Sequence, residues 1–191
     1  MNTLEAIRTR RSIRRFKPDP LPEDVLKEIL TAATLAPSGK NKQPWRFVVV
    51  RADKRPELLA VMRAGLAARK AESIPLGSSE WTTKVMEQAP ITLLVFNADE
   101  EDPFGHKDFG DVFGNMVDVQ SIGAAIQNLL LAAQELGVGS LWICDIFYAY
   151  GEVCAWLNER HQLIAAISLG YVDEMPLPRP RKALDEVVRW L

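Results

Sequence analysis

Apolar residues follow two spacings along the chain, and the spacing changes from segment to segment. A spacing of three and four residues predicts helices over 22–36 and 56–71, and a further helix is expected near 152–158. Because helices or long connections separate the strand-like runs, the order predicts a mixed α and β fold. The predicted buried strands are short β-branched or aromatic runs at 45–50, 91–96, 140–146 and 163–169.

The stretch 118–136 is apolar on nearly all sides of a predicted helix. Ile122 and Leu129 lie on one face, while Ala124 and Leu131 lie on the other. A helix that is apolar all round must be buried all round. In a chain of 191 residues, we expect a second copy of the protein to supply part of that cover, which predicts a homodimer.

Three further segments depart from the regular pattern. Asn2 and Glu5 have the spacing of a capping box, which predicts a short first helix that ends in arginines. Residues 98–111 are acidic and broken by Pro and Gly, so an irregular surface connection is expected there. From Met175 onward, three prolines within five residues predict an extended arm.

Composition and charge narrow the range of functions. The chain is 48% hydrophobic and 25% charged, and its size suits a single domain over residues 1–191. A net charge of −2 argues against a protein that coats nucleic acid. The sequence has no signal-peptide pattern and no apolar run of about 20 residues, so we expect a cytoplasmic protein without a membrane span. Cys144, Cys154, His106 and His161 lack the spacing of metal ligands, so no metal site is predicted.

Five arginines occupy nine positions in RTRRSIRRF, residues 8–16. One interpretation is a solvated helix end, where arginines interact weakly with the helix dipole. Contact with nucleic acid is a second interpretation, which the acidic loops elsewhere disfavour. The third is a phosphate monoester, a dianion that several charge-assisted hydrogen bonds hold best. Arg179 and Arg181 on the arm favour this third interpretation, because they supply a second basic cluster for one anion.

Four motifs occur in the same order as in the nitroreductase family of flavin enzymes, and the chain resembles that family over essentially its whole length. The resemblance implies an α+β fold in which helices surround a mostly antiparallel central sheet. It also implies an intimate, domain-swapped-like homodimer that binds FMN at the subunit interface, with the C-terminal arm, about 175–191, crossing to the partner. The motifs are RRSIRRF, APSGKNKQPW, IGAAIQNLLLAAQELGVGSLWI and LGYVDEMPLPRPRK.

The resemblance also assigns roles to individual residues. It implies that Arg10 is a phosphate ligand, that Ser12 lies near the ribityl chain or ring edge, and that Arg14 lies beside the flavin pyrimidine. A fixed cation there favours the negative charge that reduction builds on the ring. The cofactor-binding residues implied are Arg10, Arg11, Ser12, Arg14, Pro37, Ser38, Gly39, Asn41, Ile143, Cys144, Arg179 and Arg181.

Two of these groups approach the flavin ring itself. In similar proteins, a loop matching Pro37, Ser38 and Gly39 packs against the ring from the other subunit, where small residues let the backbone come close. A backbone amide matching Cys144 is offered to flavin N5, although many relatives have glycine where this chain has Ile-Cys-Asp. Arg8 and Arg15 receive no role and are expected at the surface.

The family implies that the flavin carries the chemistry, so no catalytic side chain is predicted. NADH or NADPH passes a hydride to N5 and leaves, and a nitroaromatic, quinone or similar acceptor then takes its place, which is ping-pong behaviour. The alternatives are another flavin chemistry within the family, such as dehalogenation, enoate reduction or flavin fragmentation, and a flavin-binding protein without turnover. The sequence does not choose between the two nicotinamides.

Overall fold

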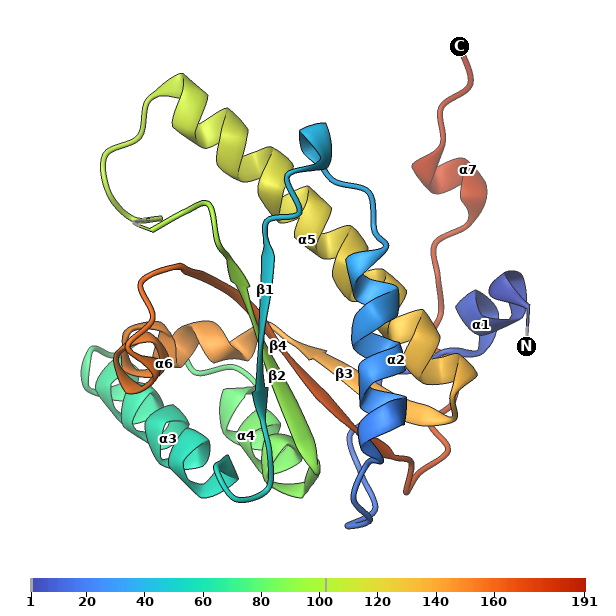
Figure 1. Ribbon diagram of the computed structural model, residues 1–191, viewed down its shortest axis with the longest axis horizontal. Coiled ribbons are helices and arrows are strands. Elements are labelled where there is room, and N and C mark those ends of the chain that lie inside the picture. The colour runs from blue at the N-terminus through green and yellow to red at the C-terminus, as the bar shows by residue number, and fades with distance from the viewer. Residues whose placement is uncertain (1, 102) are drawn as a thin grey trace.

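A four-stranded antiparallel sheet forms the centre of the protein, in the order β1-β2-β4-β3. The computed structural model describes residues 2–101 and 103–191. Helices cover both faces of the sheet (Figure 1), so the predicted α+β class with an antiparallel central sheet is confirmed. The strands are β1 (Trp45–Val50), β2 (Ile91–Asn97), β3 (Val138–Ile143) and β4 (Gln162–Tyr171).

Each face of the sheet has its own hydrophobic core. Leu94 and Phe96 of β2 pack toward α3 (Arg55–Ala71), α4 (Ser79–Gln88) and α6 (Tyr150–Leu157). Leu93 and Val95, the alternate residues of the same strand, pack toward the other face. This alternation is the ordinary consequence of the two-residue period of a strand. The helices on the second face are α2 (Glu23–Thr34) and α5 (Phe109–Glu135).

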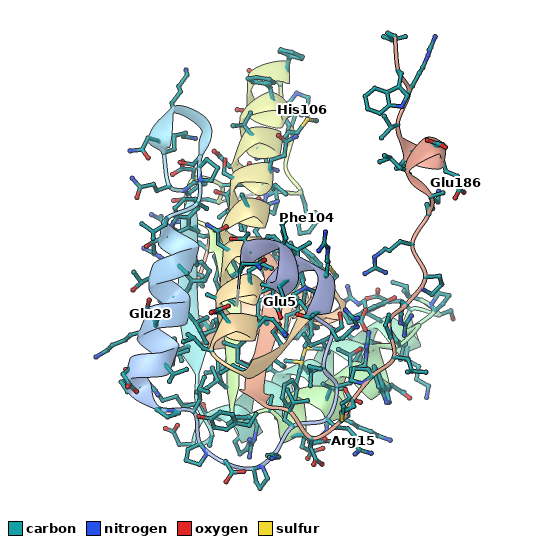
Figure 2. The ribbon with its side chains drawn as sticks, turned by 90° about the vertical axis from the view of Figure 1, so that its right-hand side faces the viewer. Glu5, Arg15, Glu28, Phe104, His106 and Glu186 are labelled. Carbon is teal, nitrogen blue, oxygen red and sulfur yellow. The ribbon has the colours of Figure 1, made fainter. Side chains whose placement is uncertain are left out.

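The two ends of the chain lie outside these layers. The first helix, α1 (Thr3–Thr9), begins at the N-cap Asn2, whose side chain accepts a hydrogen bond from the Glu5 amide. Figure 2 shows the C-terminal arm leaving the body and carrying Glu186, in the short helix α7 (Leu184–Val187), beyond it. Its large apolar side chains stay exposed in the single chain, among them Leu177, Leu184, Val187 and Trp190.

Helix α5 begins nine residues earlier than the predicted helix 118–136, so the irregular connection expected over 98–111 ends at Asp108. Asp108 is the N-cap: its carboxylate accepts from the Asp111 amide at 2.9 Å, and the Asp111 carboxylate accepts from the Asp108 amide at 3.1 Å. This reciprocal cap starts the helix despite the nearby glycines. The early turns are exposed in the single chain, whereas the later turns are buried.

The predicted strand 140–146 is also shifted. The ladder between β3 and β4 runs from Val138 to Ile143, and the chain then turns into a 3-10 helix, η2 (Asp145–Ala149). Residues 79–88 form a further helix, α4. The early end of β3 places Cys144 at the exit of a strand, and α4 packs against the turn that follows it.

Helix α5 is long and apolar enough to cross a membrane by length and composition. Its middle instead packs against α2 and the sheet, and it contains the buried polar residues Asp118 and Ser121. An ionisable residue is costly inside a bilayer, whereas Asp118 has an ion-pair partner, Lys42, at 3.0 Å. These contacts identify α5 as the core helix of a folded domain.

Candidate functional site

Residues 12–17, near the N-terminus, lie alongside the segment that leads into the C-terminal arm. They run along β3 and then along the end of β4, where the Ile13 amide donates to the Ser140 carbonyl and the Lys17 amide donates to the Tyr171 carbonyl, both at 2.9 Å. The Glu174 carboxylate then accepts from the backbone amides of Arg14 and Arg15. These contacts fix the base of the arm beside the arginine-rich segment.

A groove, which we call the arginine groove, lies between the N-terminal arginine-rich segment and the C-terminal arm and has a volume of about 450 Å³. Residues 7–14 form one wall, and residues 176–181 of the arm form the other. Ser12 adds a hydroxyl, and no aspartate or glutamate lines the groove among the described residues. Such a set of donors suits a compact anion with two charges. The lining arginines are Arg8, Arg10, Arg11, Arg14, Arg179 and Arg181.

Arg10 is a partly buried arginine of this groove with other arginines close to it. Burial lowers the pKa of its guanidinium, and the positive charges of Arg181 and Arg11 lower it further. Because Arg181 lowers the pKa of Arg10, the charges at the two ends of the chain are close enough to repel each other. A bound dianion would relieve this repulsion, because each guanidinium then gains an opposite charge.

The arginines of residues 8–16 make different contacts in the structure. Arg11 donates to the backbone carbonyls of Arg8 and Arg10, so it also holds the end of α1. Arg14 donates to the Ser12 carbonyl, and its guanidinium carbon lies 5.6 Å from the centre of the Trp81 ring. Arg15 points away and donates to the Asp173 carbonyl. Both Arg8 and Arg15 are exposed, as expected, and Arg8 in addition lines the groove because α1 ends at its edge.

The loop 37–43 lies against the middle of α5. The Gly39 amide donates to the Ser121 hydroxyl at 3.2 Å, and a Cβ on Gly39 would come within 2.4 Å of Val117 Cγ1. Asn41, like two of its neighbours, has a positive φ. The loop is held in this conformation by the Ser38 hydroxyl, which accepts from the Gln43 amide at 3.0 Å. Only a residue without a side chain fits at position 39.

The arginine groove and the loop 37–43 do not meet within one chain. Gln134, near the end of α5, bonds to Thr9 beside the groove, whereas Ser121 bonds to the loop. Thirteen helical residues separate these two contacts, which is about 20 Å along the axis of α5. Four of the predicted site residues, Pro37, Ser38, Gly39 and Asn41, therefore lie outside the groove of their own chain.

The third predicted group, Ile143 and Cys144, lies at the exit of β3. Ile143 is buried in the core at the last pair between β3 and β4. Cys144 reaches the surface, yet partial burial raises the pKa of its thiol, and the negative charge of Asp145 raises it further. The thiol therefore stays protonated at neutral pH, which disfavours a nucleophilic role.

Several residues near the groove were missed by sequence reasoning. Trp81 on α4 covers Arg14, and Glu174 holds the arm, but neither belongs to a recognisable motif. Arg8 belongs to the arginine run and could have been included on that ground. Lys84 lines a separate groove with Arg63, between α3 and α4.

Comparison with known proteins places this geometry in a family. The Nitroreductase family profile matches residues 7–171. A Thermus thermophilus relative named NADH dehydrogenase is 31% identical over 95% of this chain and 92% of its own, and a Rhodospirillum rubrum relative named 5,6-dimethylbenzimidazole synthase is 30% identical over 91% and 90%. A Desulfovibrio desulfuricans protein, solved in complex with FMN, superposes with a TM-score of 0.76 at 30% identity, covering 98% of this chain and 95% of that one.

Proposed function

The chain belongs to the nitroreductase family, and from this premise we propose that it is an FMN-dependent NAD(P)H oxidoreductase that reduces nitroaromatic, quinone or similar electron-poor acceptors. The observation that carries the proposal is the arginine groove, in which Arg10 from one end of the chain and Arg179 and Arg181 from the other line the same space. The FMN complex of the Desulfovibrio desulfuricans relative supports this choice of anion.

The residues of the groove fit a phosphate monoester. Its charges come from guanidinium groups, which form paired hydrogen bonds with phosphate oxygens, and Ser12 adds a further donor. The lowered pKa of Arg10 reflects burial and neighbouring positive charge that such an anion would offset. We assign the FMN phosphate to Arg10, Arg179 and Arg181, and the lower ribityl chain to Ser12.

The remaining predicted residues serve the flavin ring in this proposal. Bound FMN supplies hydride and electron transfer between a nicotinamide and an acceptor that occupy the same space in turn. Arg14, held by the Ser12 carbonyl and by the Trp81 ring, provides a fixed positive charge beside the ring. The Cys144 peptide, just beyond the last β3 pair, presents an amide donor to it. No side-chain acid or nucleophile is needed.

A homodimer completes the proposed site. The loop 37–43 lies about 20 Å from the groove of its own chain, measured along α5, so we propose that it contacts the flavin of the partner. Apolar side chains that a partner could cover are exposed in the single chain, on the first turns of α5 and on the arm. They include Phe109, Phe113, Met116, Leu184 and Trp190.

A second candidate function is another flavin chemistry within the same family. It is favoured by the Rhodospirillum rubrum relative, whose name describes a synthase rather than a dehydrogenase. The two candidates differ in the fate of the cofactor and the acceptor. Recovery of intact FMN after many turnovers with a quinone supports the oxidoreductase, whereas loss of FMN with each turnover supports flavin fragmentation.

We expect the purified protein to be yellow and to contain one FMN per chain. Anaerobic NADH or NADPH should bleach the flavin absorbance, and a nitroaromatic or quinone should restore it, because the proposed site passes electrons from one to the other. The measurement is stopped-flow absorbance under anaerobic conditions. A flavin that neither nicotinamide reduces indicates a binding protein without turnover and contradicts the oxidoreductase.

We also expect a dimer in solution, with twice the 21.4 kDa mass of the chain by light scattering at micromolar concentration. Sharing of the site can be tested by mixing defects. Arg10→Ala/Arg179→Ala damages the groove, and Gly39→Val displaces the loop from Val117. If the loop acts on the partner, the mixed dimer contains one intact site and one doubly damaged site, so it should bind one FMN.

The same mixture excludes the opposite arrangement. If each loop served its own chain, both sites of the mixed dimer would carry one defect, and FMN would bind to neither. A dimer of two Gly39→Val chains is the control, since both of its sites lack a correctly placed loop. A monomeric mass for the unmodified protein would contradict the shared site altogether.

A further inference from the structure

The turn that follows β3 is held on three sides by the segment 65–82. We call residues 144–149 the β3 exit turn; it comprises Cys144 and η2. Asp145 is bound by α4, the Tyr148 hydroxyl donates to the Pro75 carbonyl at 3.0 Å, and Ala149 lies against Gly65 of α3. A Cβ on Gly65 would come within 2.5 Å of the Ala149 backbone, so the turn is pressed closely onto α3.

Asp145 makes the polar contacts between this turn and α4. Its Oδ2 accepts a hydrogen bond from the Ser78 hydroxyl at 2.9 Å and another from the Thr82 hydroxyl at 2.6 Å. Thr82 is buried, and Ser78 is the N-cap residue of α4. The carboxylate therefore sits at the N-terminal end of a ten-residue helix, where the helix dipole favours a negative charge.

The same turn of α4 contacts the wall of the arginine groove. Trp81 lies between Ser78 and Thr82 in the sequence, and its ring is the one over which the Arg14 guanidinium lies. Arg14 lines the groove. One helical turn thus connects Asp145, at the end of β3, with Arg14, at the groove.

The charge of Asp145 acts on its neighbour. Cys144 is next to it in the chain, and after burial the Asp145 charge is the second cause that raises the pKa of the Cys144 thiol. A group placed against the β3 exit turn experiences the same negative potential. The negative potential of Asp145 opposes the positive potential of Arg14, because Asp145 contacts α4 at Thr82 and Arg14 contacts it at Trp81.

We propose that Asp145 is a positioning residue: its hydrogen bonds to Ser78 and Thr82 fix the Cys144 peptide relative to the Trp81–Arg14 wall, and its charge lowers the reduction potential of the bound flavin. The inference rests on the proposed function, because it concerns FMN bound in the groove. Its sign follows from charge: reduction adds negative charge to the ring, which a nearby carboxylate disfavours and Arg14 favours.

Two variants separate the charge from the hydrogen bonds. Asp145→Asn keeps an oxygen that can accept from Ser78 and Thr82 but removes the charge. Ser78→Ala/Thr82→Val keeps the charge but removes both donors. Thr83→Val is the matched control, since Thr83 is also a buried threonine of α4 but donates to the Ser79 carbonyl and not to Asp145.

For Asp145→Asn we expect the ratio of reduced to oxidised FMN, in equilibrium with a reference dye, to rise by roughly three- to tenfold, as expected for loss of a partly solvated charge. FMN affinity should change little. For Ser78→Ala/Thr82→Val we expect FMN to bind roughly tenfold more weakly, from the loss of two hydrogen bonds to a charged group. Thr83→Val should match the unmodified protein in both measurements.

A purely structural role would lower the melting temperature of Asp145→Asn and leave the redox ratio unchanged, and that result would overturn the inference. So would unaltered FMN affinity in Ser78→Ala/Thr82→Val. The apoprotein gives an independent reading, because Asp145→Asn should lower the pKa of the Cys144 thiol, measured by thiolate absorbance in a Cys154→Ser background. If the unmodified protein binds no FMN, the proposed function is wrong. If Asp145→Asn leaves the pKa of the Cys144 thiol unchanged in the apoprotein, the electrostatic effect of Asp145 on the β3 exit turn is wrong.

Discussion

Replacing Arg10 and Arg179 together by alanine is expected to give a largely colourless protein that binds FMN between about 10² and 10⁴ times more weakly. Each residue would lose a charge-assisted hydrogen bond to the phosphate, and such a bond contributes roughly 1.5–3 kcal/mol. The two residues come from opposite ends of the chain and line the same groove. Fluorescence titration of the apoprotein with FMN measures the dissociation constant directly.

The control must remove two arginines from elsewhere. Arg63→Ala/Arg160→Ala changes the net charge equally, and both residues form exposed ion pairs, with Glu87 and Glu101, and do not line the groove. This variant should bind FMN normally. Riboflavin, which lacks the phosphate, should bind equally to the unmodified protein and to Arg10→Ala/Arg179→Ala. Full retention of FMN by the groove variant would contradict the phosphate assignment.

Replacing Lys42 by methionine is expected to reduce the free energy of unfolding by about 2–3 kcal/mol, because it leaves the buried Asp118 carboxylate without its partner. The Asp118 side chain is 5% exposed and lies 3.0 Å from the Lys42 ammonium, which also contacts Asp99 at 2.9 Å. The expected loss is smaller than for a fully buried pair because Lys42 itself is 42% exposed, so water can screen the interaction. Urea denaturation measures the change.

The pH dependence of this effect has a definite sign. Hydrogen bonds to Asp99 and Asp118 raise the pKa of Lys42 above its ordinary value of 10.5. A raised pKa in the folded state stabilises the protein fully below the unfolded-state pKa, and this contribution is lost as the pH rises through the folded-state pKa. The stability difference between the unmodified protein and Lys42→Met should therefore be constant from neutral pH to about pH 9 and shrink above pH 10.5.

Two further variants test the cause. Lys42→Met/Asp118→Asn should recover part of the lost stability, because it also removes the stranded charge. Lys54→Met is the matched control, since Lys54 pairs with Glu57 on an exposed helix end, where little change is expected. If Lys42→Met and Lys54→Met unfold alike, Lys42 does not stabilise the loop 37–43. Weaker FMN binding by Lys42→Met would additionally support the role of that loop at the flavin.

The sequence predicted the strands better than the places where elements begin and end. Strand β1 has the predicted bounds, because its β-branched and aromatic run is bracketed by loop residues. The start of α5 was missed because a local cap between Asp108 and Asp111 outweighs a composition rich in acid and glycine. The end of β3 was missed because the apolar run continues to Ile146, while pairing with β4 stops at Ile143.

The family, the α+β class and the residues of the proposed phosphate site could all be predicted from the chain, because motif order and arginine spacing are properties of the sequence. Which of these residues meet depends on long-range contacts that appear only in the folded protein. The pairing of residues 12–17 with β3 and β4 brings both chain ends to one groove, whereas the length of α5 keeps the loop 37–43 about 20 Å away. Contacts such as Asp145 with Thr82 join residues 63 positions apart, and no local pattern records them.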